Sequence, residues 1–304
     1  MALLKPRVMS LVVFTAFTGL VCAGAPMSPT LAFVAVLCIA VGAGAAGALN
    51  MWYDADIDGL MRRTRARPIP MGRVQSADAL GLGIVLSLLS VMMMGMAANW
   101  LAAGLLAFTI LFYAVIYTMW LKRSTPQNIV IGGAAGALPP VIGWAAASGH
   151  TPLNAWLLFA IIALWTPPHS WALALYTAGD YAKAGVPMMP VAKGAASTRR
   201  QILLYSLVFV PTAIAPSVTG LGGPLYLGVS SLGGAVFLLL AARLARSGQG
   251  EADGAKSGLY EVKVGSKDAR NLFAFSILYL TLLFAALLAE HGLGLTPLRL
   301  PFSL

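Results

Sequence analysis

Long apolar runs divide this chain of 304 residues and most constrain how it can fold. A helix needs about 20 predominantly apolar residues to cross the hydrocarbon core of a bilayer. Nine runs in the sequence approach or reach that length. We therefore predict an all-α polytopic membrane protein with nine transmembrane helices, over residues 8–25, 31–50, 78–97, 100–121, 128–148, 153–173, 201–220, 223–243 and 271–290.

The composition excludes the main soluble alternatives. Hydrophobic residues make up 59% of the chain and charged residues only 10%, against roughly 45–50% and 25% in soluble domains. A nucleic-acid binder would need a polar surface to carry its basic patch, so no nucleic-acid partner is expected. Two cysteines, Cys22 and Cys38, lie inside apolar runs and provide no disulfide framework.

Basic residues predict the orientation, because Lys and Arg concentrate in cytoplasmic loops. With nine spans, 19 of the 20 basic residues fall on one side, and only Arg299 falls on the other. We predict a cytoplasmic N-terminus and an outside C-terminus. The chain is expected to form a single domain over 1–304, with polar cytoplasmic segments at 51–77, 122–127, 174–200 and 244–270.

Acidic residues are scarce, yet three of the ten lie within five residues after the second apolar run. Asn50, Asp54 and Asp58 are spaced i, i+4, i+8, which aligns them on one helical face and leaves Asp56 off it. Stacked carboxylates repel one another and are costly at a membrane boundary, so a cation is expected beside them. Hard oxygen ligands suit Mg²⁺, which binds one or two carboxylates together with substrate phosphates.

Four arginines follow this acidic row directly, at positions 62, 63, 65 and 67. Guanidinium groups beside a metal site suggest a diphosphate that is held by both. The alternative is a solvated cytoplasmic loop in which the acids simply pair with the arginines. The regular spacing of the acids on a helical extension favours the diphosphate site.

Two further polar clusters lie after the fourth and sixth runs. Lys122 and Arg123 are either topology anchors or ligands of phosphate oxygens. His169 follows two prolines and is either a hydrogen-bonded structural group, a ligand of a metal or porphyrin iron, or a proton carrier. Asp180 and Lys183 are spaced i, i+3 and are able to pair with each other.

All three clusters fall at the predicted cytoplasmic ends of spans, whereas the outer loops are short and nearly uncharged. A transporter would more plausibly place functional polar residues near the bilayer midplane, in broken helices of two repeated halves. The one-sided distribution therefore favours a membrane-embedded enzyme with a cytoplasmic polar mouth over a transporter.

The motifs resemble the UbiA superfamily of intramembrane prenyltransferases, from Lys5 through the last apolar run. Three stretches carry most of the resemblance: NMWYDADIDGLMRRTRARP at 50–68, LKRSTPQNIVIGGAAGALPP at 121–140 and WTPPHSWALALYTAGDYAKAGVPMMP at 165–190. The first fits several prenyltransferases, whereas the second and third resemble the branch of the family that farnesylates heme. The resemblance implies a nine-helix bundle around a central cavity, in a bacterial cytoplasmic (inner) membrane with the active site facing the cytoplasm.

The same resemblance assigns roles to residues. Asn50, Asp54 and Asp58 would hold Mg²⁺, and Asp54, Asp58, Lys122 and Asp180 would be catalytic. A further set would bind the diphosphate of farnesyl diphosphate: Arg62, Arg67, Lys122, Arg123 and Lys183. His169 would contact heme B, as an iron ligand or through a propionate.

The implied reaction transfers a farnesyl group to the vinyl group of heme B, with water addition, and gives heme O and diphosphate. The implied partners are farnesyl diphosphate, heme B and the lipid bilayer, and possible ones are a downstream heme A synthase or a terminal oxidase assembly. The alternatives are a family member that acts on a quinone precursor or a chlorophyll-like acceptor and, less favoured, a transporter.

Overall fold

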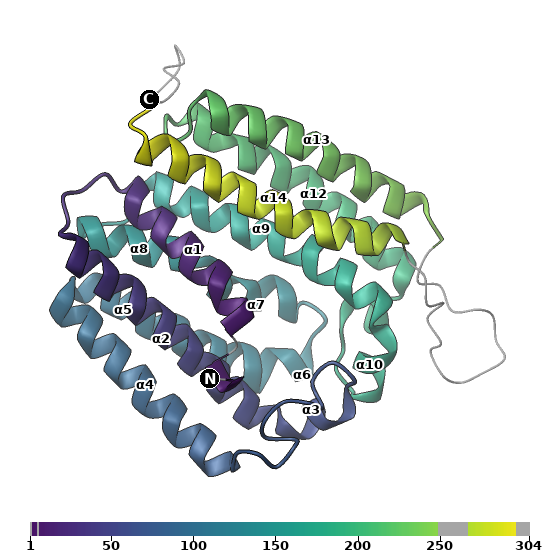
Figure 1. Cartoon of the computed structure of the whole chain (residues 1–304). Helices are drawn as coiled ribbons and strands as arrows, with labels where there is room; N and C mark the ends of the chain where they lie inside the picture. Colours follow the sequence, from purple (N-terminus) through teal and green to yellow (C-terminus); the bar gives the residue numbers. More distant parts are fainter. Residues whose placement is uncertain (1, 5, 249–266, 296–304) are drawn as a thin grey trace. The chain divides into compact units, whose positions relative to one another are not determined.

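The computed structural model describes residues 2–4, 6–248 and 267–295, and regular structure within them is exclusively helical (Figure 1). This confirms the all-α prediction for the described part of the chain. The elements are η1 (Ala2–Leu4), α1 (Pro6–Cys22), α2 (Pro29–Tyr53), α3 (Ala55–Leu60), α4 (Ser76–Ala97), α5 (Trp100–Leu111), η2 (Phe112–Leu121), α6 (Lys122–Ser124), α7 (Asn128–Ala137), α8 (Pro139–Ser148), α9 (Leu153–Tyr176), α10 (Ala178–Lys183), α11 (Met189–Lys193), α12 (Ala195–Val218), α13 (Pro224–Arg246) and α14 (Lys267–Gly292).

Eight helical stretches among the described residues are long and apolar enough to cross a membrane. They correspond to the last eight predicted runs and are Pro29–Tyr53, Ser76–Ala97, Trp100–Ser124, Asn128–Ser148, Leu153–Tyr176, Ala195–Val218, Pro224–Arg246 and Lys267–Gly292. The first predicted run, 8–25, is the shorter helix α1, whose apolar part is Met9–Cys22. The ninth crossing therefore stays a prediction.

The chain divides into two compact units. One comprises Met1–Trp120 with Ala134–Phe159, and the other comprises Leu121–Gly133 with Ala160–Leu304. The acidic row at 50–58 belongs to the first unit, and His169 belongs to the second. Part of the predicted polar segment 244–270, residues 249–266, lies outside the described residues, as does Arg299.

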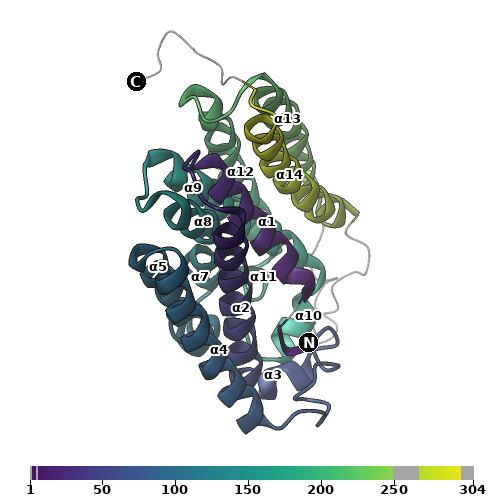
Figure 2. The same cartoon turned by 60° about the vertical axis from the view of Figure 1, so that its left-hand side comes forward.

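In the first unit, α2 lies between α1 and α4 and contacts both (Figures 1 and 2). Ser28 begins α2, because its hydroxyl accepts a hydrogen bond from Leu31 N at 3.3 Å and Pro29 occupies the first turn. Small residues allow neighbouring helices to approach closely in lipid. A Cβ at Gly42 would lie 2.9 Å from Leu106 Cδ1, so this position accepts no larger side chain without a shift.

Helices α1 and α8 of the first unit approach each other backbone to backbone at two glycines. A Cβ at Gly19 would lie 2.1 Å from Pro140 O, and a Cβ at Gly143 would lie 2.0 Å from Ala16 O. The backbone of each helix therefore occupies the space of the other's missing side chain. Apolar run 128–148 bends at Leu138, where α7 ends and α8 begins with two prolines.

In the second unit, α13 packs against both α12 and α14 (Figure 1). An aromatic cluster joins the three helices, with the Phe209 ring 5.1 Å from that of Phe237 and 5.8 Å from that of Tyr279. The Tyr279 hydroxyl donates to Ser230 O at 2.6 Å. The buried phenol thus keeps a hydrogen-bond partner, as a polar group inside a membrane protein requires.

Glu290 of α14 caps the N-terminus of α13. Its carboxylate is buried and accepts from Gly223 N at 2.6 Å and Tyr226 N at 3.0 Å, two donors that have no partner within their own helix. We expect Glu290→Gln to destabilise the fold by about 1–3 kcal/mol, because the amide keeps the shape but loses a charged acceptor. Thermal unfolding in detergent would measure this, with the exposed Asp78→Asn as control; equal midpoints for the two variants would contradict the capping role.

Candidate active site

The acidic row forms where α2 passes into α3. Asp54 ends α2 with φ −86° and ψ 7°, yet its N–H donates to Asn50 O at 3.0 Å, and Asp58 N donates to Asp54 O at 2.8 Å. The i to i+4 spacing therefore continues across the junction. Asn50, Asp54 and Asp58 are all buried, whereas Asp56 is exposed. The prediction that Asp56 lies off the common face is confirmed.

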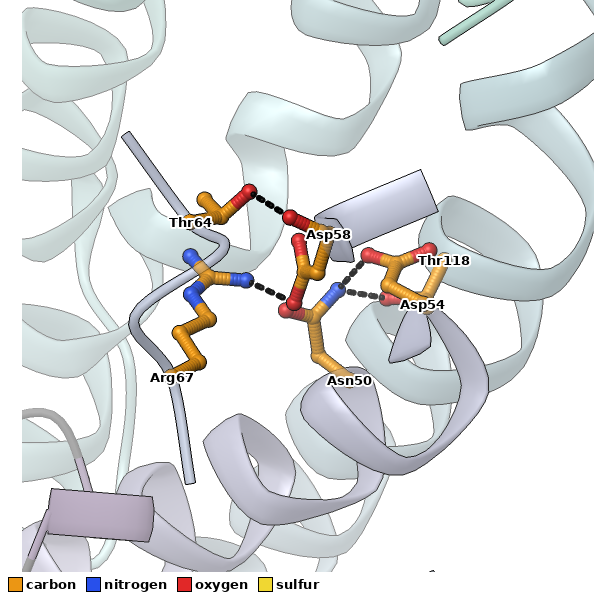
Figure 3. A network of polar contacts seen from close by, with 6 residues as sticks. All are labelled: Asn50, Asp54, Asp58, Thr64, Arg67 and Thr118. Carbon is orange, nitrogen blue, oxygen red and sulfur yellow. Dashed lines mark hydrogen bonds and ion pairs between the residues drawn. The ribbon is translucent and has the colours of Figure 1, made fainter. Parts of the chain in front are cut away.

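Asn50 connects the row to the helical stretch Trp100–Ser124, two spans further along the chain. Its Nδ2 donates to Asp54 Oδ2 at 2.7 Å and to Thr118 Oγ1 at 3.1 Å (Figure 3). The Thr118 hydroxyl itself donates to Tyr113 O at 2.8 Å, so it can only accept from the asparagine. These bonds fix the amide with its nitrogen toward Asp54 and Thr118 and its oxygen away from both.

Asp58 is held by the turn that follows α3. Arg67 Nη1 lies 2.5 Å from Asp58 Oδ2, and the Thr64 hydroxyl donates to Asp58 O at 2.9 Å (Figure 3). The carboxylate is fully buried, whereas 21% of the arginine side chain is exposed. One of the predicted arginines therefore pairs with an acid of the row, as the solvated-loop alternative expected. The acid is buried, however, which argues against a loop that is solvated.

The row is chemically suited to a hard cation. Asp58 Oδ1 is buried and has no hydrogen-bond partner among the described residues. A buried carboxylate oxygen without a donor calls for a compensating group, and oxygen ligands suit Mg²⁺. In the described parts of the chain, no three His, Cys, Asp or Glu side chains are placed so that they could hold a metal ion together. The candidate set is accordingly two carboxylates and one amide: Asp54, Asp58 and Asn50.

Thr118 was not predicted from the sequence. It lies in η2, a π-helical stretch of ten residues, and bonds to the carbonyl five residues before it. Such segments are rare and frequently mark functional sites. A threonine inside the apolar run 100–121 is the signal that sequence reasoning could have used.

The predicted cations Lys122 and Arg123 belong to the second unit and form the short helix α6. Asn128 stabilises the turn after them, because its Nδ2 donates to Thr125 O at 2.8 Å. Asn128 is fully buried, and its Oδ1 has no hydrogen-bond partner among the described residues. It lies within the second sequence motif, at 121–140, but no role was predicted for it there.

The remaining predicted residues occupy short helices and turns. Asp180 and Lys183 lie on α10, the first half-buried and the second exposed, and Arg62 lies exposed in the turn after α3. In the second unit, α9 continues through Pro167 and Pro168 without interruption.

His169 is enclosed by aromatic rings in the second unit. Its imidazole stacks on Trp165 at 4.1 Å and on Phe273 at 4.6 Å between ring centroids. Its Nδ1 lies 2.7 Å from the Ser276 hydroxyl. The histidine is therefore hydrogen-bonded, as the structural interpretation of the sequence predicted. This bond uses Nδ1 and does not involve Nε2.

An all-helical membrane fold with a buried Asn-Asp-Asp row beside an arginine is the arrangement expected of an intramembrane prenyltransferase. The model of the UbiA prenyltransferase family matches residues 12–260, so the chain belongs to this family. The family and the eight apolar helices make it an integral membrane enzyme of the transferase class.

Curated relatives are similar over nearly their whole length. The chain is 70% identical to a protoheme IX farnesyltransferase from a Caulobacter species, over 98% of this chain and 90% of that protein. It is 67% identical to proteins of the same name from Caulobacter vibrioides, covering 98% and 92%, and from Maricaulis maris, covering 96% and 89%.

Solved structures of low identity share the fold. A digeranylgeranylglyceryl phosphate synthase superposes with a TM-score of 0.75 at 15% identity, covering 95% of this chain and 96% of that one. A UbiA homologue from Archaeoglobus fulgidus bound to DMAPP and Mg²⁺ gives a TM-score of 0.63 at 18% identity, covering 94% and 98%. These likenesses concern the arrangement of the helices.

Proposed function

We propose that this enzyme transfers the farnesyl group of farnesyl diphosphate to the vinyl group of heme B, protoheme IX, and releases diphosphate. Water then adds and gives heme O. The observation that carries the proposal is the 67–70% identity to three proteins named protoheme IX farnesyltransferase, over at least 96% of this chain. The buried acidic row supplies the polar site that such a reaction needs.

Asn50, Asp54 and Asp58 are the proposed Mg²⁺ ligands. Two structures of the low-identity Archaeoglobus fulgidus homologue are bound to DMAPP or GPP together with Mg²⁺, which supports use of the same ion here. When bound, Mg²⁺ would supply charge stabilisation to the departing diphosphate. The chain contributes fixed ligand positions, because the backbone bonds across the α2–α3 junction and Thr118 hold the row in place.

Cationic side chains are proposed to receive the leaving group. Breaking the allylic C–O bond develops negative charge on diphosphate, and fixed cations lower the free energy of that transition state. This role goes to Arg62, Arg67, Lys122, Arg123 and Lys183. Asp180 is the proposed further catalytic carboxylate, and His169 is the proposed contact to heme B.

We also propose nine crossings, with a cytoplasmic N-terminus, an outside C-terminus and an active site that opens to the cytoplasm. The distribution of 19 of 20 basic residues supports this arrangement. Bacterial relatives support location in the cytoplasmic membrane. Heme O would then be delivered to a heme A synthase or a terminal oxidase assembly.

The proposal is tested by incubating the purified full chain with heme B, farnesyl diphosphate and Mg²⁺. Mass spectrometry should detect heme O, and omission of Mg²⁺ with added chelator should abolish it. Parallel reactions with hydroxybenzoate and a chlorophyll precursor identify the acceptor. Prenylation of either of these but not of heme would refute the proposal, and so would substrate flux across proteoliposomes without any prenyl transfer.

We predict that Thr118→Val raises the Mg²⁺ concentration needed for half-maximal activity by about 10- to 100-fold, the usual effect of removing a partner of a metal ligand. The reason is that valine no longer accepts the Asn50 amide N–H. Thr118→Ser, which keeps the hydroxyl, should retain the wild-type affinity for Mg²⁺. Thr109→Val is the matched control, because among the described residues that hydroxyl bonds Leu105 O of its own helix, at 2.7 Å, and no metal-site residue. Equal Mg²⁺ dependence in both valine variants would refute the assignment.

A further inference from the structure

The imidazole of His169 can be approached only through its edge. The plane of the Trp165 ring lies at 18° to that of the imidazole, and the plane of the Phe273 ring lies at 24° to it, so both rings stack on His169. Two stacked neighbours at 4.1 and 4.6 Å leave no room for a third ring against the faces. The two edge nitrogens therefore decide what the histidine can bind.

The network around Ser276 assigns the proton of His169. The Ser276 hydroxyl lies 2.6 Å from Phe273 O and donates to it, because a carbonyl oxygen only accepts. A hydroxyl has one proton, so Ser276 must accept the bond that joins it to His169 Nδ1 at 2.7 Å. In the neutral ring Nδ1 carries the proton, and Nε2 keeps its lone pair. Nε2 has no hydrogen-bond partner among the described residues.

Ser276 also fixes one of the stacking rings. Its backbone carbonyl accepts a hydrogen bond from Trp165 Nε1 at 2.8 Å. Ser276 thus holds the edge of the imidazole through its side chain and the stacking ring of Trp165 through its backbone. Removal of the hydroxyl alone leaves the Trp165 bond intact, so the two contributions can be separated by substitution.

We propose that Ser276 is a positioning residue for His169 and presents Nε2 as the one nitrogen that ligates the iron of the porphyrin acceptor. The identity of the ligand rests on the proposed function, whereas the assignment of the His169 tautomer does not. A hydrogen bond to the distal ring nitrogen is the usual support of a metal-ligating histidine, because it fixes the ring and raises the basicity of the ligating nitrogen.

The tautomer is tested without any heme. The full chain contains three histidines, so ¹⁵N-histidine labelling in detergent gives a simple two-bond ¹H–¹⁵N spectrum. His150 Nδ1 faces Ser148 O at 3.0 Å and His291 Nε2 faces Leu221 O at 2.9 Å, so they serve as references for the two tautomers. His169 should show the Nδ1–H pattern in the wild type and in Ser276→Thr, and a mixture in Ser276→Ala.

The matched control is Ser230→Ala. Ser230 is buried in the same unit, and its hydroxyl bonds the carbonyl three residues before it, as that of Ser276 does. Among the described residues, it makes no hydrogen bond to a histidine. This variant should leave the His169 pattern unchanged. An Nε2–H pattern in the wild type, or an unchanged Nδ1–H pattern in Ser276→Ala, would overturn the assignment of Ser276.

Iron ligation is tested by titrating the full chain with ferric protoheme and following the Soret band. Ser276→Ala should weaken binding by about 10- to 100-fold, and His169→Ala should lose the histidine-ligated band, which added imidazole restores. Ser230→Ala should titrate like the wild type. An unaltered Soret band in His169→Ala would overturn ligation while the tautomer result stands. Failure to form heme O with both results intact would reject the proposed function alone.

Discussion

Asp54→Asn and Asp58→Asn should each reduce heme O formation by at least about 100-fold. The amide keeps the size of the carboxylate but removes the negative charge that binds a metal ion. A bound metal contributes several kcal/mol of transition-state charge stabilisation, and 1.36 kcal/mol corresponds to a tenfold change in rate. Both carboxylates are completely buried, so no neighbouring surface acid can replace them.

The control is Asp56→Asn, because Asp56 lies between the two on the sequence but is exposed and off the common face. We expect it to retain most of the wild-type rate. Product formation is measured by mass spectrometry over a range of Mg²⁺ concentrations, with thermal unfolding to verify that each variant folds. If all three variants lose activity equally, the buried row is not the metal site.

The largest stability effect is expected at the α1–α8 crossing. Gly143→Ala places a Cβ 2.0 Å from Ala16 O, and backbone atoms on both sides cannot move as a side chain would. We predict a loss of at least about 3 kcal/mol, at the upper end of the range for overpacking. Gly143→Leu should fail to give a monodisperse folded protein. Gly19→Ala should behave like Gly143→Ala, because its Cβ would meet Pro140 O.

Gly104→Ala is the matched control within α5, since nothing lies within 4 Å of a Cβ at that position. Alanine there should be neutral or stabilise by up to about 1 kcal/mol, because glycine is the weaker helix former. Unfolding midpoints in the same detergent compare the variants. A Gly143→Ala protein as stable as Gly104→Ala would show that the two helices do not approach so closely.

The acidic row shows how far sequence periodicity reaches. The spacing of Asn50, Asp54 and Asp58 predicts a common face, and the burial of all three with Asp56 exposed agrees with it. This works because the hydrogen bonds that define a helical face are local. The same reasoning could not find Thr118, because a π-helical stretch changes the register by which a residue faces its neighbours.

The sequence by itself determined that this chain is a helical membrane protein, since apolar run length and the need to satisfy the backbone in lipid leave helices as the solution. It also indicated the prenyltransferase family through local motifs. Only the tertiary structure decided the partners that complete each site. Ser276 meets His169 across 107 residues, and Thr118 meets Asn50 across 68. Such contacts depend on how helices pack, which local periodicity does not encode.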